Sequence, residues 1–372
     1  MLPLRGFWRR HRRKFLITSG VLGGGYFLYK LYNAHKCRLA DLEKELANER
    51  EHEELIKAQV AAHFENIQRI ADTTTLPHAM RYLSIRIAEE LDLSQLTEKL
   101  MKGKGQPSTL TPLEKLELWD RLKILSFTRL VVSLWAMTIL SLYIRTQVNI
   151  LGRHLYIDTA RLLGSSLYIE DVDIIERDGQ KKFLASSDFL ANVGIQALSS
   201  DVQLAAAEVF KGKQLRDFFN TTTLHETVMQ ILDLLMSRRS PHHWVEYVMP
   251  ADTTFDEQPI DSISDDALNI NTTKFEQLMA EARAVISSAE FLVVLETSLK
   301  VAVEAIVDDL GAESGGGSLT SGMPLARVVP RVAQICPLLL EEPSENRYLQ
   351  IIRTVQQAEQ FFSILYAGMP TS

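Results

Sequence analysis

Cysteine is scarce in this 372-residue chain, which contains only Cys37 and Cys336. Two cysteines are too few for a disulfide framework or a cysteine-based zinc site, and they suit a reducing compartment. Glycine and proline are also few, at 18 and 12 residues, while hydrophobic residues make up 46% of the chain. We therefore expect a folded, largely helical body, long enough for one large domain or two smaller ones.

Acidic residues are missing from the first 38 positions, which carry nine lysines and arginines. The rest of the chain then holds 31 basic and 47 acidic residues, a net charge of about −16. Nucleic-acid binding needs a basic face, so we do not expect a nucleic-acid partner for this body. The basic tip instead suits an anionic membrane surface.

Motifs of catalysis, cofactor binding and metal binding are missing as well. His242 and His243 lie near Glu246, but the spacing is not H-E-x-x-H, and a histidine pair in a loop is the simpler reading. The glycine-rich stretch at 103–109 lacks the spacing of a phosphate-binding loop, and no G-x-S-x-G nucleophile motif occurs. We expect no enzyme activity, no cofactor, no metal and no small-molecule substrate.

The N-terminus predicts an uncleaved membrane anchor, Phe15 to Tyr32. An uncharged run extends to Tyr29 and rises only roughly 22 Å, but Lys30 can snorkel and so lengthen the apolar segment to Tyr32. A mitochondrial presequence and a soluble helix are the alternatives. The separation of the basic block from the apolar block favours the anchor. The basic flank consists of Arg9, Arg10, Arg12, Arg13 and Lys14.

The remaining chain predicts an all-α fold, an elongated helical bundle. We expect this bundle to form one domain over residues 39–372, preceded by an anchor domain over residues 1–38. A charged stalk helix is expected over 39–71, where glutamates interrupt the heptads of a coiled coil. A second helical region follows over 77–102, and a long helix over 112–149. The uncharged segment 130–144 within that helix is either a second membrane span or a buried central helix, and its 15 residues favour burial.

Helix starts are predicted from capping patterns, and loops from turn residues. Thr111, Pro112 and Glu114 form an N-cap, a first-turn proline and a capping-box glutamate. The Asp178-Gly179 pair predicts either a small hairpin or a plain loop within a loop region over 150–185. Further loops are expected over 237–266 and 311–322, and a last helix over 345–366. The other predicted capping boxes are Ser200/Gln203, Thr223/Glu226 and Thr273/Glu276.

The stretch "LEKLELWDRLKILSFTR", residues 113–129, is the most informative about function. On a helix, Leu116, Trp119 and Lys123 lie on one face, beside the face of Leu118 and Leu122. A tryptophan at the rim of a buried face, edged by Lys115 and Lys123, suits the docking of an amphipathic, partly acidic helix. The alternative is that Trp119 belongs to the core.

This stretch, followed by "RTQVNILGRHLYID", resembles the central signature of the peroxin-3 family. Supporting matches are "VLGGGYFLYK" in the anchor, "YVMP" at 247–250 and "MPLARVVPRV" at 323–332. The resemblance covers nearly the whole chain. The chain departs from the pattern by extra residues around 103–112 and by Arg153, which stands where a second glycine is expected.

The resemblance implies a peroxisomal membrane protein whose helical body faces the cytosol and docks peroxin-19, the receptor that delivers newly made membrane proteins. It matches the family's groove tryptophan to Trp119. Its other groove positions correspond to Leu116, Leu122, Lys123, Leu100, Met101 and Lys102. The partners expected are thus peroxin-19 and peroxisomal membrane lipids. The alternative function is a membrane-anchored tether or scaffold that uses the 39–71 stalk.

Overall fold

The structure is a computed structural model that describes residues 42–52, 54–102, 111–164, 172–238, 242–250, 265–312 and 319–368, with five positions before residue 42. Side chains are described for these residues except 102, 157–164, 172–178 and 265–273. The predicted anchor lies outside this part of the chain except for Lys30. The chain divides into two units, residues 1–63 and 64–372, and the predicted boundary at residue 38 stays a prediction.

In the first unit, residues 42–52 and 54–63 are helical, as the charged stalk predicts. Four large apolar side chains on this helix are exposed to solvent: Leu42, Leu46, Leu55 and Ile56. The helix therefore buries little surface within its own unit.

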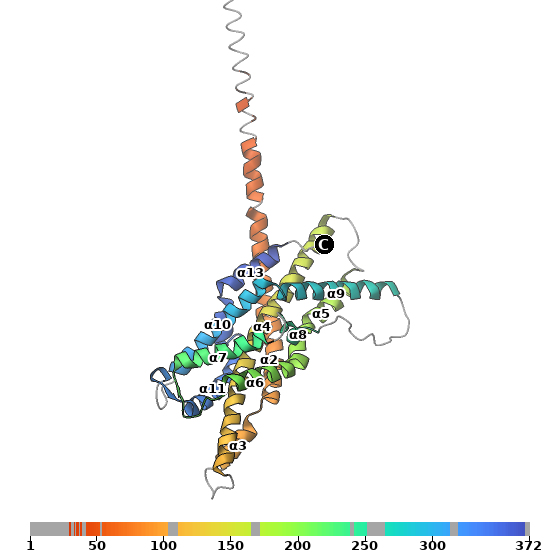
Figure 1. Cartoon of the computed structure of the whole chain (residues 1–372). Coiled ribbons are helices and arrows are strands. Elements are labelled where there is room, and N and C mark those ends of the chain that lie inside the picture. Colours follow the sequence, from red (N-terminus) through yellow and green to blue (C-terminus); the bar gives the residue numbers. More distant parts are fainter. Residues whose placement is uncertain are drawn as a thin grey trace, which may run out of the picture. The chain divides into compact units, whose positions relative to one another are not determined.

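The second unit consists almost entirely of helices, which confirms the predicted all-α class (Figure 1). After helical residues 64–70 come a π-helical turn, η1 (Ala71–Thr75), and α2 (Leu76–Glu90). A single pair of short strands occurs in the described residues, with β1 (Phe218–Phe219) antiparallel to β2 (Met323–Pro324). The other helices are α3 (Ser94–Lys102), α4 (Pro112–Gly164), α5 (Val172–Ala185), η2 (Ser186–Asp188), η3 (Leu190–Gly194), α6 (Ile195–Val209), α7 (Thr221–Ser237), α8 (Val245–Val248), α9 (Asp265–Ile286), α10 (Ala289–Ala312), η4 (Leu319–Ser321), α11 (Leu325–Leu339), α12 (Arg347–Arg353) and α13 (Gln356–Ala367).

Helix α4 forms the centre of the second unit and packs against α2, α6, α9, α10, α11 and α13. Its start is the predicted capping box, because the Thr111 amide donates to Glu114 Oε2 at 2.7 Å and the Glu114 amide donates to Thr111 Oγ1 at 3.3 Å. By length and composition α4 could cross a membrane. However, its segment 130–144 is buried all round by neighbouring helices, with no side chain more than 2% exposed, as expected for a central helix.

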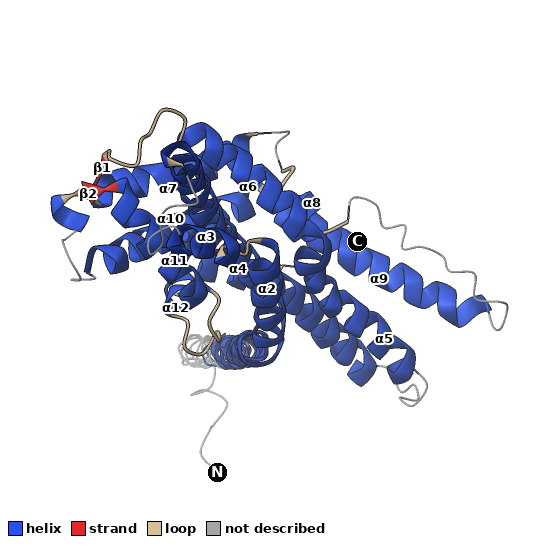
Figure 2. Cartoon of the chain, turned by 90° about the horizontal axis from the view of Figure 1, so that it is seen from below, coloured by secondary structure: helices blue, strands red, loops and turns tan. Residues whose placement is uncertain are grey.

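The predicted loop and hairpin over 150–185 are wrong in the described residues of this range, 150–164 and 172–185. Helix α4 continues to Gly164, and α5 carries Asp178 and Gly179 inside its 14 residues. Figure 2 shows α5 and α9 side by side, and their packing stabilises a helix that the turn residues alone would disfavour. Arg153, in the part expected to be loop, is buried and donates from Nη1 to the carbonyls of Leu365 and Gly368, both at 3.0 Å.

Several helix ends also differ from prediction. Helix α7 begins one turn earlier than the predicted cap, because Asn220 Oδ1 accepts the Thr223 amide at 2.8 Å. The predicted capping boxes Ser200/Gln203 and Thr273/Glu276 lie inside α6 and α9 and do not mark helix starts. The predicted last helix, 345–366, is divided into α12 and α13, with Asn346 capping α12. Of the predicted loop over 237–266, residues 245–248 form the short helix α8, in which Val245, Tyr247 and Val248 are buried.

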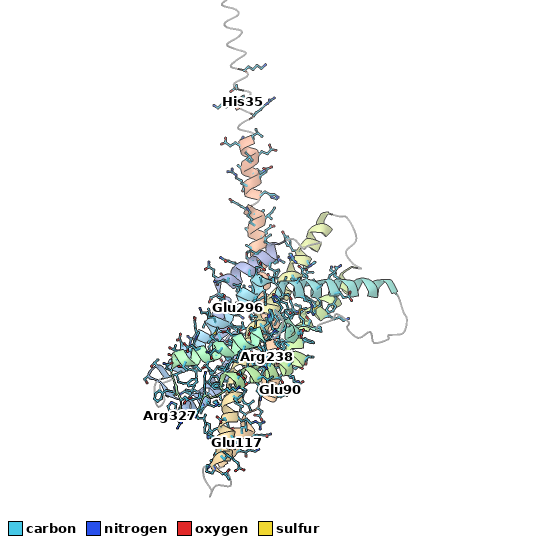
Figure 3. The ribbon with its side chains drawn as sticks, viewed as in Figure 1. His35, Glu90, Glu117, Arg238, Glu296 and Arg327 are labelled. Carbon is cyan, nitrogen blue, oxygen red and sulfur yellow. The ribbon has the colours of Figure 1, made fainter. Side chains whose placement is uncertain are left out.

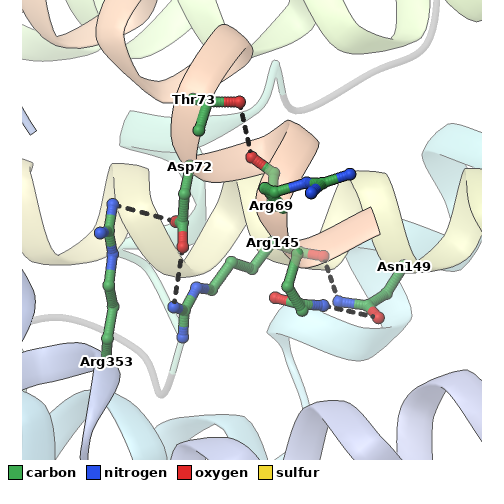
Figure 4. A network of polar contacts seen from close by, with 7 residues as sticks. Arg69, Asp72, Thr73, Arg145, Asn149 and Arg353 are labelled. Atoms are coloured by element: carbon green, nitrogen blue, oxygen red, sulfur yellow. Dashed lines mark hydrogen bonds and ion pairs between the residues drawn. The ribbon is translucent and has the colours of Figure 1, made fainter. Parts of the chain in front are cut away.

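A cluster of charged side chains joins η1 to α4 and α12 (Figure 4). Asp72 lies 3.6 Å from Arg145 Nη2 and 3.1 Å from Arg353 Nη2. One turn earlier, Gln68 donates to Asn149 Oδ1 at 3.0 Å. Burial lowers the pKa of the Arg145 guanidinium, and the Asp72 carboxylate opposes that shift. The pairing with Asp72 thus compensates for a charge held inside the bundle.

Candidate functional site

The start of α4 and the end of α3 expose large apolar side chains. Met101 on α3 is 74% exposed, and Leu113 and Leu116 on α4 are 67% and 52% exposed. The two helices pack against each other in the described residues. Figure 3 labels Glu117, next to Leu116, where α4 begins at one end of the body. Because apolar residues exposed together on a folded domain mark interaction sites, we take this surface as the candidate site and call it the α3–α4 corner.

Trp119 lies at the inner edge of the α3–α4 corner and is half-buried. One turn towards the start of the helix, Leu116 is exposed, and one turn further on, Leu122 is buried at 5% exposure. Trp119 therefore marks the position where α4 passes from the surface into the core. Trp119 is thus neither fully buried nor fully exposed, so part of it packs in the protein and part reaches solvent.

Lys123 does not lie at the rim of the buried face beside Trp119, where it was predicted. Its side chain is 4% exposed, and its ammonium donates to the Lys213 carbonyl at 2.8 Å and to Asp120 Oδ1 at 3.0 Å. The same ammonium lies 5.5 Å from the centre of the Phe210 ring. Lys123 thus supports the α3–α4 corner from beneath by attaching α4 to the segment after α6. Of the lysines predicted to edge Trp119, Lys115 is half-buried.

The predicted groove residues on α3 differ in their exposure to solvent. Leu100 is half-buried, Met101 is largely exposed, and the Lys102 side chain lies outside the described residues. Leu113 was missed by the sequence interpretation, although it precedes Leu116 by three residues and so shares its helical face. That spacing was the signal that could have identified it.

Two charged groups near the α3–α4 corner are held by contacts within the protein. Lys213 lies over the rings of Phe210 and Phe219, at 5.6 and 5.7 Å, and burial lowers the pKa of its ammonium. At the helix start, hydrogen bonds from Thr111 lower the pKa of the Glu114 carboxyl. The exposed apolar side chains of the corner are interleaved with exposed charged ones, among them Lys99, Glu117 and Arg121.

The α3–α4 corner offers apolar contacts to a partner. No group of three or more His, Cys, Asp or Glu side chains that could hold a metal occurs in the described part of the chain. His243 is buried with its ring 5.8 Å from that of Tyr247, while His242 occupies a left-handed turn at φ 69°. An exposed apolar surface with a half-buried tryptophan is suited to receive the apolar face of a partner helix.

A sequence model of the family described as Peroxin-3 matches residues 6–112 and 105–368. The chain belongs to the peroxin-3 family. Peroxisome biogenesis protein 3-2 of Arabidopsis thaliana is 56% identical over 368 residues, covering 99% of both chains. Peroxisomal biogenesis factor 3 of Homo sapiens is 28% identical over 394 residues, covering 99% of this chain and 98% of the human one.

A more distant peroxin-3 relative, Peroxisomal biogenesis factor 3 of Yarrowia lipolytica, is 22% identical over 433 residues. It covers 97% of this chain and 98% of its own length. The similarity to peroxin-3 proteins therefore extends from end to end. Membership of the family indicates a role in peroxisome biogenesis and an association with peroxisomes.

Proposed function

We propose that this protein is a docking receptor at the peroxisomal membrane, which binds cargo-loaded peroxin-19 and so directs the insertion of peroxisomal membrane proteins. The observation that carries the proposal is the half-buried Trp119 with exposed Leu113 and Leu116 on α4 and exposed Met101 on α3, a helix that packs against α4. The protein acts by binding and performs no catalysis.

Three features of the α3–α4 corner favour the binding of a helical partner. Its apolar side chains come from two packed helices, and a groove between two helices is a common docking place for a third. Trp119 is held in part by the core, so little side-chain entropy is lost when it is covered. Lys123 connects α4 to the Lys213 segment and holds this part of the helix in place before binding.

The membrane part of the proposal rests on the sequence. The basic flank and the apolar segment from Phe15 to Tyr32 would anchor the chain in the peroxisomal membrane. The family resemblance implies a body on the cytosolic side, whereas the basic residues before the segment would by themselves favour a cytosolic N-terminus. The structure adds that the long apolar helix α4 is buried inside the body, and its apolar length is thus explained by packing.

A tether or scaffold is the second candidate function. Its specific support is the exposure of Leu42, Leu46, Leu55 and Ile56 along the first unit, since these side chains could pair with another stalk. This alternative makes Trp119 dispensable.

The test compares peroxin-19 binding by the full chain in detergent with binding by its Trp119→Ala variant. Because loss of a central anchor of this kind costs about 2–4 kcal/mol, we expect an affinity roughly 30- to 1,000-fold weaker. Ile364→Ala is the matched control, since Ile364 is an apolar residue 72% exposed on α13. Equal affinities for all three proteins, with unchanged helicity, would reject the site. If none of the three bound, the receptor function itself would be rejected.

A further inference from the structure

The solvent-exposed face of η3 and α6 carries no charge up to Ala207, and the exposed Glu208 follows at the end of α6. Between residues 192 and 207 the only charged residue, Asp201, is buried and accepts a hydrogen bond from the Tyr247 hydroxyl at 2.6 Å. Val193 and Leu204 are 57% and 53% exposed on this face. We call it the α6 strip, and its exposed residues are Asn192, Val193, Gln196, Ala197, Ser200, Gln203, Leu204 and Ala207.

The α6 strip lacks the charged residues that an exposed helix face normally carries. Charged residues make up 23% of the chain, and solvated helix faces normally carry most of them. Depletion of charge is instead typical of the buried centre of a protein–protein interface. The α6 strip shares this depletion of charge with the centre of an interface.

Helix α2 lies beside the strip and is attached to it by polar contacts. The Tyr82 hydroxyl donates to Asn192 Oδ1, and Arg86 Nε donates to the Ala191 carbonyl at 3.3 Å. On the exposed side of α2, Arg81, Ile85 and Glu89 are four residues apart and share one face. Ile85 is 48% exposed, and the Glu89 side chain is 59% exposed although it accepts from Arg86 at 2.8 Å.

This α2 face is complementary to itself. A basic residue and an acidic residue stand at equal distances on either side of Ile85. If a second copy approaches with its α2 antiparallel, a two-fold axis at Ile85 brings the two Ile85 side chains together. The same axis places Arg81 of each copy opposite Glu89 of the other, and the uncharged α6 strips lie alongside without burying a charge.

We propose that the α2 face and the α6 strip form a symmetric interface with a second copy of this chain. The partner is assigned as a second copy because the order basic, apolar, acidic along α2 is complementary to the same order read in reverse. The interface uses α2, η3 and α6, and none of its residues belongs to the α3–α4 corner. The inference is thus independent of peroxin-19 binding.

Charge reversal tests the pairing of Arg81 with Glu89. The full chain in detergent is followed by light scattering up to roughly 100 µM, a range that detects weak pairs. Arg81→Glu and Glu89→Arg should each weaken self-association at least about tenfold, because like charges then face each other twice. Mixing these two variants should restore association as a heterodimer, since opposite charges again meet at both contacts. Restoration also proves that each variant is folded.

Cysteine cross-linking tests the two-fold axis itself. In the full chain carrying Cys37→Ser, reconstituted in vesicles, Ile85→Cys should form a disulfide-linked dimer on mild oxidation. Glu296→Cys, an exposed position on α10, is the control and should remain monomeric. Wild-type chains that stay monomeric over the whole range, together with no excess dimer for Ile85→Cys over the control, would overturn the proposal. Failure of the mixed variants to associate when the wild type does would also overturn it.

Discussion

Lys123 donates its buried ammonium to the backbone carbonyl of Lys213, 90 positions further along the chain, at 2.8 Å. This contact fastens the start of α4 to the segment between α6 and α7, and it places the lysine below the apolar surface that surrounds Trp119. A lysine beside Trp119 suggests contact with a partner. Lys123 instead has a structural role, because it holds in place the surface that a partner would contact.

Replacing Lys123 by methionine should therefore lower stability. The variant keeps most of the side-chain volume but leaves the Lys213 carbonyl without its donor, at an expected cost of about 1–3 kcal/mol. Thermal unfolding followed by circular dichroism measures the effect. Lys211→Met is the matched control, because Lys211 is 78% exposed and its contact with Glu208 is long, 3.9 Å. An unchanged melting temperature, combined with lost peroxin-19 binding, would show that Lys123 instead contacts the partner.

Alanine substitutions at three glycines should affect the stability of the protein to different degrees. A Cβ at Gly194 would lie 1.8 Å from the Tyr247 carbonyl oxygen, and neither backbone can move away cheaply. At Gly152 the obstacle, at 2.1 Å, is the end of the flexible Ile67 side chain, and at Gly179 nothing lies within 4 Å. We expect severe loss of folded protein for Gly194→Ala, a moderate fall in melting temperature for Gly152→Ala, and a gain of up to about 1 kcal/mol for Gly179→Ala within α5. Equal melting temperatures for the first and third variants would contradict this packing.

The Asp72 carboxylate should be needed to hold Arg145 and Arg353 together. Asp72→Asn leaves two guanidinium groups facing each other in a largely buried place, so we expect a loss of about 2–4 kcal/mol. Asp233→Asn on the exposed face of α7 provides the control, with little change expected. Matching melting temperatures for the two variants would mean that the charged cluster contributes nothing to stability.

Stability should decrease in alkaline solution because of Cys336. Burial raises the pKa of this thiol from 9.0 to about 12, so the folded protein keeps the proton that the unfolded chain releases above pH 9. The contribution is complete below pH 9 and is lost as the pH rises towards 12. Between about pH 8 and 10.5, the melting temperature should fall less for Cys336→Ala than for the wild type. Parallel falls would show that the thiol does not contribute.

The parts of the fold that local chemistry determines were predictable from the sequence. The capping box at Thr111 and Glu114 and the burial of residues 130–144 both follow from nearby residues, and both are confirmed. Other features depend on distant contacts. Asp178 and Gly179 lie in a helix because α5 packs on α9, and Arg153 continues α4 by binding the end of α13.

The candidate site was predictable only in part, for the same reason. Helical spacing identified Trp119 and Leu116, and the same spacing contained the signal for Leu113. It could not show that Lys123 points inward, since this depends on the Lys213 carbonyl and the Phe210 ring, which are contributed by a remote segment.

Hydrogen exchange of the full chain, with and without peroxin-19, tests the central claim most directly because it locates the partner without altering the protein. The account predicts slower exchange in α3 and in residues 112–123 of α4, with little change along α6 and α13. Slower exchange confined to other helices, with α3 and the start of α4 unaffected by a saturating partner, would contradict the assignment of the docking site to Trp119.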